Sequence, residues 1–269
     1  MDYKVYNFNT EKVKNDLIEW IKVWFDGDES KGIIGNGKGC NAVIGISGGK
    51  DSTVVAALCV EALGKDRVIG IMMPNGVQKD ISDSIKVCEF LGIKNYTINI
   101  EDSVNGVLKQ MFINDIDISN QTHTNLPARI RMSVLYAVAQ SVNGRVSNNC
   151  NASENCVGYS SRWGDAAGDF SPLGKLTTVE IVQIGDALGL PYELTHKTPI
   201  DGLNTNPDGS YVTDEQSMGV SYDDIHSYIR NDKIIDRNKF KIISEKQIKN
   251  KFKIELIPEF EPSNEDLYR

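Results

Sequence analysis

The sequence predicts an α/β protein with a doubly wound, mostly parallel sheet flanked by helices. Apolar runs that suit buried strands, at 42–46, 68–73 and 95–100, alternate with segments of helical periodicity. This alternation is typical of parallel sheets covered by helices on both faces. No internal repeat or low-complexity tract divides the 269 residues, and 40% of them are hydrophobic. We therefore expect residues 1–269 to form a single domain with a full core.

The first half of the chain can be assigned element by element. An amphipathic helix is predicted near the N-terminus, because its apolar residues recur at helical spacing: Val13, Leu17, Trp20, Ile21 and Trp24. Residues 26–40 contain five glycines and charges of both signs, which predicts a mobile loop. Three helices are then expected between and after the strands, at 53–63, 81–91 and from about residue 103.

The second half is predicted to begin with a long helix. Pro127 suits the first turn of a helix, and the periodicity continues to about Val142. A fourth strand is expected at 145–147, followed by a loop-like stretch at 148–175 and a further helix that starts at the capping box Thr177–Glu180. The Gly-, Asn- and Asp-rich residues 200–212 indicate a surface loop, and another helix start is expected at 213–216.

Composition limits the classes of function. The formal net charge is −8, which argues against a nucleic acid as the main partner. The five cysteines include no Cys-x-x-Cys pair, so a disulfide framework is not expected and a reducing, cytoplasmic environment fits. The N-terminal residues lack the apolar segment of a secretion signal, and no run approaches 18 apolar residues, so neither export nor a membrane span is predicted.

A glycine-rich loop follows the first predicted strand. Residues 45–53 read Gly-Ile-Ser-Gly-Gly-Lys-Asp-Ser-Thr and lead directly into the apolar helix 54–63. A strand, a loop of small residues and a helix N-terminus form an anion site, because backbone N–H groups point outward and the helix dipole favours negative charge. The order of residues is not that of the Walker loop. It resembles the Ser-Gly-Gly-x-Asp-Ser loop of the ATP pyrophosphatases, the PP-loop families, although a tight turn with glycines for packing would also fit.

Two carboxylates are candidate magnesium ligands. Asp51 lies within the glycine-rich loop, where it would repel a triphosphate unless a cation lay between them. Mg²⁺ binds few protein carboxylates together with phosphate oxygens. Glu154 lies in the loop-like stretch after the fourth strand and could supply a second ligand. The alternative for Asp51 is a carboxylate stabilised by the helix dipole alone.

Two arginines lie close to the predicted start of the long helix. Arg129 and Arg131 follow Pro127, where the positive end of the helix dipole disfavours them unless an anion is nearby. A phosphate-bearing substrate would match the guanidinium geometry, and a structural salt bridge is the alternative. Polar and charged residues also gather in 151–170, beyond the end of a strand, where ligands bind in open α/β sheets.

Taken together, the motifs resemble those of the ammonia-dependent NAD synthetases. The matching segments follow the family's order and cover the chain nearly from end to end: GISGGKDST (45–53), MPNGVQKD (73–80), NLPARIRM (125–132), NASENCVGYSSRWGDAAGDFSPL (151–173), KTPIDGL (197–203) and DEQSMGVSYDDIHSYI (214–229). The resemblance implies that ATP adenylates the nicotinate carboxylate of deamido-NAD, that ammonia attacks the adenylate, and that NAD, AMP and pyrophosphate result.

The resemblance also implies site residues and partners. ATP is expected to contact Gly45, Ile46, Ser47, Gly48, Gly49, Lys50, Asp51, Ser52, Asn149 and Thr178. Mg²⁺ is expected on Asp51 and Glu154, which are the catalytic candidates, and deamido-NAD on Arg129, Arg162, Asp169 and Lys253. A homodimer is expected, with the deamido-NAD site near its interface and the helix of Trp20 and Trp24 as a candidate contact. No glutaminase domain is expected, so free ammonia is the predicted nitrogen donor.

Several positions depart from the family's common pattern. Asn149 stands where many members have a threonine, Thr178 where many have a lysine, and Ile200 where many have a threonine. Arg162 replaces a common lysine, and the usual His-Lys pair near the C-terminus becomes Phe252-Lys253. These differences leave the reaction class intact and concern the details of contact with ATP and substrate. Thr178 could simply belong to the helix cap.

Two other readings of the same residues remain open. A tRNA-thiolating or tRNA-modifying PP-loop enzyme would be expected to have catalytic cysteine pairs and a basic surface, whereas Cys150 and Cys156 have five residues between them and the chain is acidic. A regulatory nucleotide-binding module without catalysis would not need both Asp51 and Glu154. Release of AMP in the presence of deamido-NAD would separate these readings from a synthetase.

Overall fold

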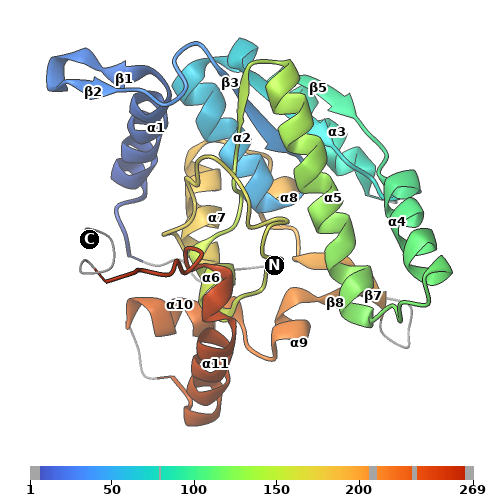
Figure 1. Cartoon of the computed structure of the whole chain (residues 1–269). Helices are drawn as coiled ribbons and strands as arrows, with labels where there is room; N and C mark the ends of the chain where they lie inside the picture. The colour runs from blue at the N-terminus through green and yellow to red at the C-terminus, as the bar shows by residue number, and fades with distance from the viewer. Residues whose placement is uncertain (1–6, 79, 206–210, 232–234, 264–269) are drawn as a thin grey trace.

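The fold is built on a parallel four-stranded sheet. The computed structural model describes residues 7–78, 80–205, 211–231 and 235–263. The sheet has the order β5-β4-β3-β6, and its strands are β3 (Asn41–Gly45), β4 (Val68–Met72), β5 (Lys94–Thr97) and β6 (Gly144–Val146). The three expected strands and the fourth are thus present, and the doubly wound α/β prediction is confirmed (Figure 1).

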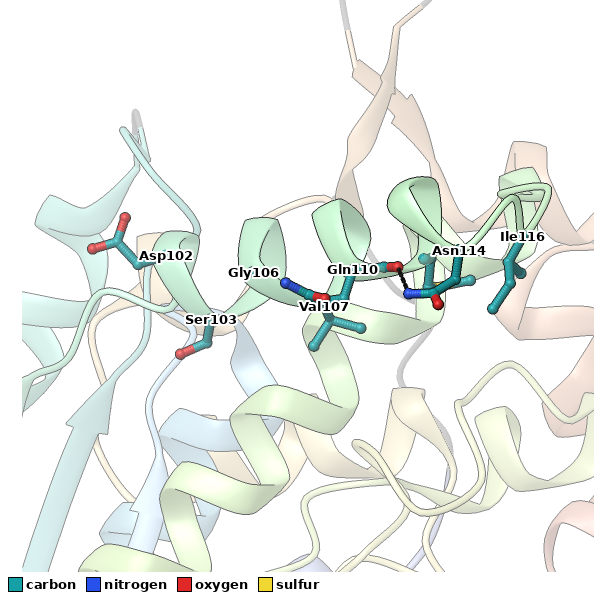
Figure 2. A pocket seen from close by; sticks show the side chains of 8 residues that line it. Asp102, Ser103, Gly106, Val107, Gln110, Asn114 and Ile116 are labelled. Carbon is teal, nitrogen blue, oxygen red and sulfur yellow. Dashed lines mark hydrogen bonds between the residues drawn. The ribbon is translucent and has the colours of Figure 1, made fainter.

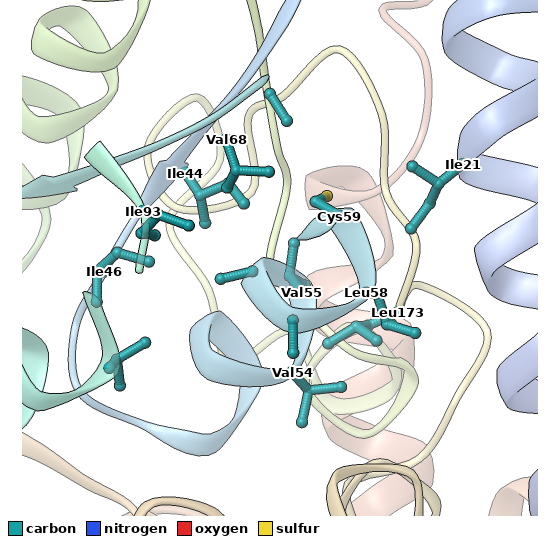
Figure 3. Packing of buried hydrophobic residues seen from close by; sticks show 14 of the residues in the cluster. Ile21, Ile44, Ile46, Val54, Val55, Leu58, Cys59, Val68, Ile93 and Leu173 are labelled. Carbon is teal, nitrogen blue, oxygen red and sulfur yellow. The ribbon is translucent and has the colours of Figure 1, made fainter. Parts of the chain in front are cut away.

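Helices cover both faces of this sheet. One face packs against α1 (Thr10–Asp26), α2 (Lys50–Leu63), α3 (Ile81–Leu91) and α7 (Thr178–Ala187), and the other against α4 (Glu101–Ile113) and α5 (Asn120–Ser141). Strand β3 shows the alternation directly, because Ile44 belongs to the first core cluster and Val43 to the second. Figure 3 shows Ile44 and Val68 of the sheet facing the side chains of α2. A strand buried on both faces must be apolar throughout.

The glycine-rich segment at 26–40 is more ordered than expected. It contains a short antiparallel hairpin of β1 (Gly27–Asp28) and β2 (Ile33–Ile34), so regular structure occupies part of the segment that the sequence predicts to be a loop. Gly27 has a φ of 80°, and a Cβ atom at this position would lie 2.5 Å from the carbonyl oxygen of Ile33. Only glycine fits such a left-handed, closely packed position.

The long helix α5 begins earlier than predicted. It starts at Asn120, and the hydroxyl of its N-cap Ser119 accepts from the N–H of Thr122 at 3.1 Å. Pro127 therefore lies inside the helix rather than in its first turn. The prediction of the start is wrong because a capping serine outweighed the proline signal. Arg129 thus lies in the third turn of the helix, and the argument from an unfavourable helix dipole does not apply to it or to Arg131.

The C-terminal part forms a third packed unit. It contains α6 (Ala152–Val157), α9 (Asp214–Met218), α10 (Tyr222–Arg230) and α11 (Arg237–Asn250). The core of this unit joins α6 to α9, α10 and α11 through Cys156, Met218, Tyr222 and Ile243. Between these helices in the chain, α8 (Tyr192–Thr195) packs on the first core through Leu194, and β7 (Ile200–Thr205) and β8 (Tyr211–Thr213) form a hairpin. Two expected loops are thus partly structured, by α6 within 148–175 and by the β7–β8 hairpin within 200–212, of which residues 206–210 lie outside the described part.

The described side chains agree with the expected absence of a disulfide framework. All five cysteines are free and buried, and burial raises the pKa of the Cys88 and Cys156 thiols to about 11. Within the described residues, no helix has both the length and the apolar character needed to cross a bilayer.

Candidate active site

The candidate site lies where the order of the sheet reverses. The chain goes from β3 to β4 and β5 on one side, and β6 then pairs with β3 on the other side. The loops that leave β3 and β6 diverge at this point, and ligands of open α/β sheets bind in such a crevice. The first loop leads into α2 and the second into α6, so two helix N-termini follow the two strands.

The loop at 45–49 has the form of an anion site. Gly48 has a φ of 77°, and a Cβ there would lie 2.9 Å from the backbone nitrogen of Ser84, so a side chain cannot be accommodated. The hydroxyl of Ser47 accepts from the N–H of Gly49 at 3.2 Å and lies 3.1 Å from the hydroxyl of Ser52. Gly49 caps α2 without a side-chain hydrogen bond. The first turn of α2 therefore keeps backbone donors for a phosphate.

Asp51 is held from two directions. Its Oδ2 atom lies 3.0 Å from Nζ of Lys50, and its Oδ1 atom accepts from Nδ2 of Asn151 at 3.0 Å. The Asp51 side chain is 18% exposed and the Lys50 side chain 4%. The Lys50 ammonium also lies 5.2 Å from the ring centroid of Tyr222. In this arrangement the buried ammonium of Lys50 pairs with the Asp51 carboxylate. Contact between Lys50 and ATP stays a prediction.

Glu154 lies close to Asp51 although it comes from another helix. It is the third residue of α6, and its Oε2 atom accepts from the N–H of Asn151 at 3.0 Å in a capping box. Burial and the negative charge of Asp51 raise the pKa of Glu154 well above its ordinary value. The two carboxylates are thus near enough to repel each other, and a cation between them would relieve that repulsion.

This donor set fits Mg²⁺. Magnesium prefers oxygen ligands and commonly binds through one or two carboxylates, with substrate phosphates and water as the other ligands. The described residues contain no group of three or more His, Cys, Asp or Glu side chains that could hold a metal. A site of two carboxylates beside a phosphate loop therefore suits an ion that arrives with a nucleotide. Asp51 and Glu154 are the residues that would hold it.

The two other predicted ATP residues are placed differently. Asn149 lies between the strand ends, where its Nδ2 donates to the carbonyl of Gly45 at 3.1 Å. Thr178 is fully buried, and its hydroxyl lies 3.4 Å from Oδ1 of Asn151. Direct contact between Thr178 and ATP stays a prediction, because in this arrangement its side chain contacts Asn151 and is shielded from solvent.

Three of the predicted deamido-NAD residues converge on the segment 158–163. Nε of Arg129 donates to the carbonyl of Arg162 at 3.3 Å. The ammonium of Lys253, in the 3₁₀ turn Lys251–Lys253, donates to the carbonyls of Gly158 and Ser160 at 2.7 and 3.0 Å. Burial lowers the pKa of Lys253. The structure therefore gathers three cationic side chains from three distant parts of the chain.

The segment 158–163 also holds buried donors that remain free. Nε of Arg162 and the hydroxyl of Ser160 are buried and have no hydrogen-bond partner within the described part of the chain. The Arg162 guanidinium lies 4.9 Å from the ring centroid of Trp163 and 5.8 Å from that of Phe252. Unpartnered buried polar groups are rare in native structures, and each calls for an explanation such as a bound water, an ion or a catalytic role.

Asp169 and Arg131 contact other groups. The Asp169 carboxylate accepts from the N–H of Val146 at 2.7 Å and from the hydroxyl of Tyr136 at 3.4 Å. Nε of Arg131 donates to the carbonyl of Met73 at 3.0 Å, and burial lowers the pKa of Arg131 although the charge of Asp165 opposes this. Among the described residues, no hydrogen bond joins Asp169 to Arg129, Arg162 or Lys253, which we call the cationic group, so the contact of Asp169 with substrate stays a prediction.

Sequence reasoning did not single out Asn151. This residue contacts both candidate magnesium ligands, by its side chain and by its backbone N–H. The available signal was the spacing Asn-x-x-Glu at 151–154, which marks a helix start with a capping box. The contact with Asp51 joins residues 100 positions apart, and only the fold brings them together.

Fold and site together define an α/β nucleotide-binding protein of the PP-loop type. The sequence model of the NAD synthase family matches residues 33–260, and the chain belongs to that family. The NH(3)-dependent NAD(+) synthetase of Archaeoglobus fulgidus is 35% identical over 256 residues, which cover 93% of this chain and 96% of that protein. The enzyme of the same name from Thermococcus sibiricus is 37% identical over 211 residues, or 78% and 76% of the two chains.

Solved structures agree with this assignment. An NMN synthetase from Francisella tularensis superposes with a TM-score of 0.79 at 29% identity, over 94% of this chain and 100% of that one. The NH3-dependent NAD synthetase of Campylobacter jejuni superposes with a TM-score of 0.74 at 25% identity, again over 94% and 100%. The family predicted from the motifs is therefore confirmed.

Proposed function

We propose that this protein catalyses the ATP-dependent amidation of deamido-NAD to NAD with ammonia. The observation that carries the proposal is the PP-loop at the switch point of the sheet, with Asp51 and Glu154 both hydrogen-bonded to Asn151 beside it. The curated relatives that share 33–38% identity with this chain are named NH(3)-dependent NAD(+) synthetases. ATP serves as co-substrate.

The reaction needs positioning more than a protein nucleophile. The nicotinate carboxylate attacks the α-phosphorus of ATP, and the bond to pyrophosphate breaks. Ammonia then attacks the acyl carbon and loses a proton to solvent. The bond from that carbon to the bridging oxygen breaks, and AMP leaves with this former carboxylate oxygen. Backbone N–H groups at 48–52 are placed to hold the departing pyrophosphate. Bound Mg²⁺ would neutralise phosphate charge, and we propose Asp51 and Glu154 as the residues that would hold it.

The cationic group at 158–163 suits the other substrate. Arg129, Arg162 and Lys253 come together there, and deamido-NAD carries a pyrophosphate and a carboxylate. Arginine donates in pairs to such anions. We also propose that Asp169 accepts a hydrogen bond from a hydroxyl of deamido-NAD, although it contacts Val146 and Tyr136 and not the cationic group.

The test is an assay that omits one component at a time. Purified protein with ATP, Mg²⁺, deamido-NAD and ammonium chloride should form NAD, AMP and pyrophosphate in equal amounts, and omission of any of the four should stop it. Ammonia-free glutamine should not replace ammonium, because we propose a single synthetase domain without a glutaminase domain. Comparable NAD formation from glutamine, or ADP in place of AMP, would contradict the proposal.

A second candidate substrate is nicotinate mononucleotide. The observation that favours it is the 29% identical NMN synthetase, the whole of which this chain covers. The same amidation would then produce NMN, because the mononucleotide carries the same nicotinate carboxylate. The ratio of kcat/KM for the two acids decides between them. Our proposal of deamido-NAD requires a ratio above one in its favour.

We also propose a homodimer, with the helix of Trp20 and Trp24 as one candidate contact. Trp20 is 42% exposed, whereas Trp24 packs inward, with its ring centroid 5.0 Å from that of Phe25 and 5.1 Å from that of Phe170. The outer face of α4 is a second candidate. It borders an open hollow of about 510 Å³ (Figure 2), and Phe112 nearby is 77% exposed.

Exposed apolar surface of this kind commonly marks an interface between proteins, and two-fold dimers are the commonest oligomers. Light scattering at micromolar concentration should give a dimer mass for the native protein and a lower mass for Phe112→Lys. A native monomer with full activity would refute the dimer. A cytoplasmic location and the absence of a nucleic-acid partner stay proposals, supported by the free cysteines and the acidic charge.

A further inference from the structure

One buried side chain connects the two carboxylates of the candidate magnesium site. Asn151 is fully buried at the N-terminus of α6. Its Oδ1 atom accepts from the N–H groups of Ser153 and Glu154 at 2.9 and 3.0 Å, and its Nδ2 atom donates to Oδ1 of Asp51 at 3.0 Å. It is thus both a helix cap and a direct partner of Asp51.

The orientation of this amide is determined by its surroundings. Two backbone N–H groups face Oδ1, and the hydroxyl of Thr178 lies 3.4 Å from it. A flipped amide would place its NH₂ group against two donors and its oxygen against the Asp51 carboxylate, which cannot donate when ionised. The capping contacts therefore direct the donor of Asn151 toward Asp51.

We propose that Asn151 is a positioning residue that holds the Asp51 carboxylate toward Glu154 for the binding of Mg²⁺ with ATP. The inference rests on the proposed function for the identity of the ion. Asp51 is on α2 and Glu154 on α6, and Asn151 contacts both, the first through Nδ2 and the second through its backbone N–H. Lys50 holds Oδ2 of Asp51, while Asn151 holds Oδ1 from the α6 side.

The hydrogen bonds leave room for the ion. An ionised carboxylate has about four lone-pair sites, and Lys50 and Asn151 use two of those on Asp51. The remaining sites can bind a cation in a fixed direction. Without the donor of Asn151, the Asp51 side chain is free to rotate toward Lys50. Part of the binding free energy of the ion would then be used to reorient the carboxylate.

The test separates positioning from capping. Serine caps a helix about as well as asparagine, but it is too short to reach Asp51 from this position. Asn151→Ser should therefore keep α6 capped and lose the contact with Asp51, whereas Asn151→Ala should lose both. The matched control is Asn9→Ser, because Asn9 caps α1 with its side chain far from the site.

We expect Asn151→Ser to reduce turnover about 10- to 100-fold, as for loss of a hydrogen bond to a charged group, and to raise the Mg²⁺ concentration needed for half-maximal rate. A second readout does not depend on turnover. The rise in Tm that ATP with Mg²⁺ produces beyond ATP with EDTA should shrink in Asn151→Ser and stay native in Asn9→Ser.

Native turnover and a native Mg²⁺ increment in Asn151→Ser would overturn the positioning role. If Asp51→Ala is inactive while Asn151→Ser is native, only this inference fails; if Asp51→Ala is also native, the proposed magnesium site fails. Should Asn151→Ser not fold, Asn151→Asp tests the same point. It keeps the size and the capping acceptor, replaces the donor by a charge that repels Asp51, and is expected to lose turnover and the Mg²⁺ increment alike.

Discussion

The glycine-rich loop at 45–53, which we call the phosphate loop, differs from the cationic group of Arg129, Arg162 and Lys253 in how its side chains are held. At the phosphate loop, Asp51 has partners on two sides, and its neighbours Lys50 and Asn151 are buried. At the cationic group, Arg162 is held through stacking and backbone contacts, and it keeps a buried donor without a partner. The C-terminal residues that cover it include Phe252, which is 54% exposed.

The proposed function assigns a different task to each of these two regions. Adenylation is the same for every acid that the site accepts, and its groups are fixed before substrate binds, which reduces the cost of ordering them. Discrimination between a mononucleotide and a dinucleotide depends on groups that can adjust. We therefore expect changes at the first region to reduce kcat and changes at the second to raise KM.

The largest effect is expected at the carboxylates. Asp51→Ala and Glu154→Gln should each reduce turnover by at least about 100-fold, since each removes a charge that would hold Mg²⁺ on ATP. Glu154→Gln should also leave Tm equal to or above the native value, because it removes a buried charge that repels Asp51. Steady-state kinetics and calorimetry measure both effects, and a native rate in either variant would contradict the magnesium assignment.

A smaller effect, on stability, is expected at the ion pair that joins α10 to α7. The Arg230 guanidinium donates to Glu180 at 2.6 and 2.7 Å. Burial alone would raise the pKa of Glu180, but the hydrogen bonds from Arg230 and from the N–H of Thr177 outweigh it and lower that pKa. Arg230 is 37% exposed, so we expect Arg230→Gln to reduce the free energy of unfolding by only about 1–2 kcal/mol.

The same ion pair gives a pH dependence with a definite sign. Because the pKa of Glu180 is lower in the folded protein, its contribution to stability is full above the unfolded value of about 4.3 and is lost as the pH falls through the folded value. Urea titrations between pH 3 and 7 should show a flatter acid limb in Arg230→Gln. Parallel curves for the two proteins would count against the ion pair.

At Arg162 we expect a tenfold effect on substrate affinity rather than on stability. Arg162→Ala should raise the KM for deamido-NAD about tenfold, or about 1.4 kcal/mol, and leave the KM for ATP and kcat within about threefold. The reason is that Arg162 lies with Arg129 at the cationic group and not at the phosphate loop. Arg162→Lys is the matched control that keeps the charge. A loss confined to kcat would erase the difference between the two regions.

The smallest effect is expected at Thr178. Thr178→Val keeps the shape and removes the hydroxyl that lies 3.4 Å from Asn151, so turnover should fall by less than about threefold, because long hydrogen bonds contribute little. The KM for ATP measured alongside decides its predicted role. A rise in that KM of tenfold or more would show that Thr178 contacts ATP directly after local opening.

The sequence alone determined the sheet, the phosphate loop and the family. Strand and helix periodicities depend on neighbours within a few residues, and the loop at 45–53 is a local arrangement of glycines behind a strand. The start of α5 was missed because Pro127 is a strong local signal, while Ser119 gives a competing one. Which of two local signals prevails depends on packing of the whole helix against the sheet.

Only the tertiary structure decided how the site residues meet. Asn151 and Asp51 are 100 positions apart, and Lys253 reaches Gly158 across 95. Such contacts depend on the order of strands in the sheet, which no local pattern encodes. The burial of Thr178 and the inward direction of Lys50 were likewise decided by packing. A motif specifies which side chains are near a strand end, and the fold determines which of them face the ligand and which hold the others in place.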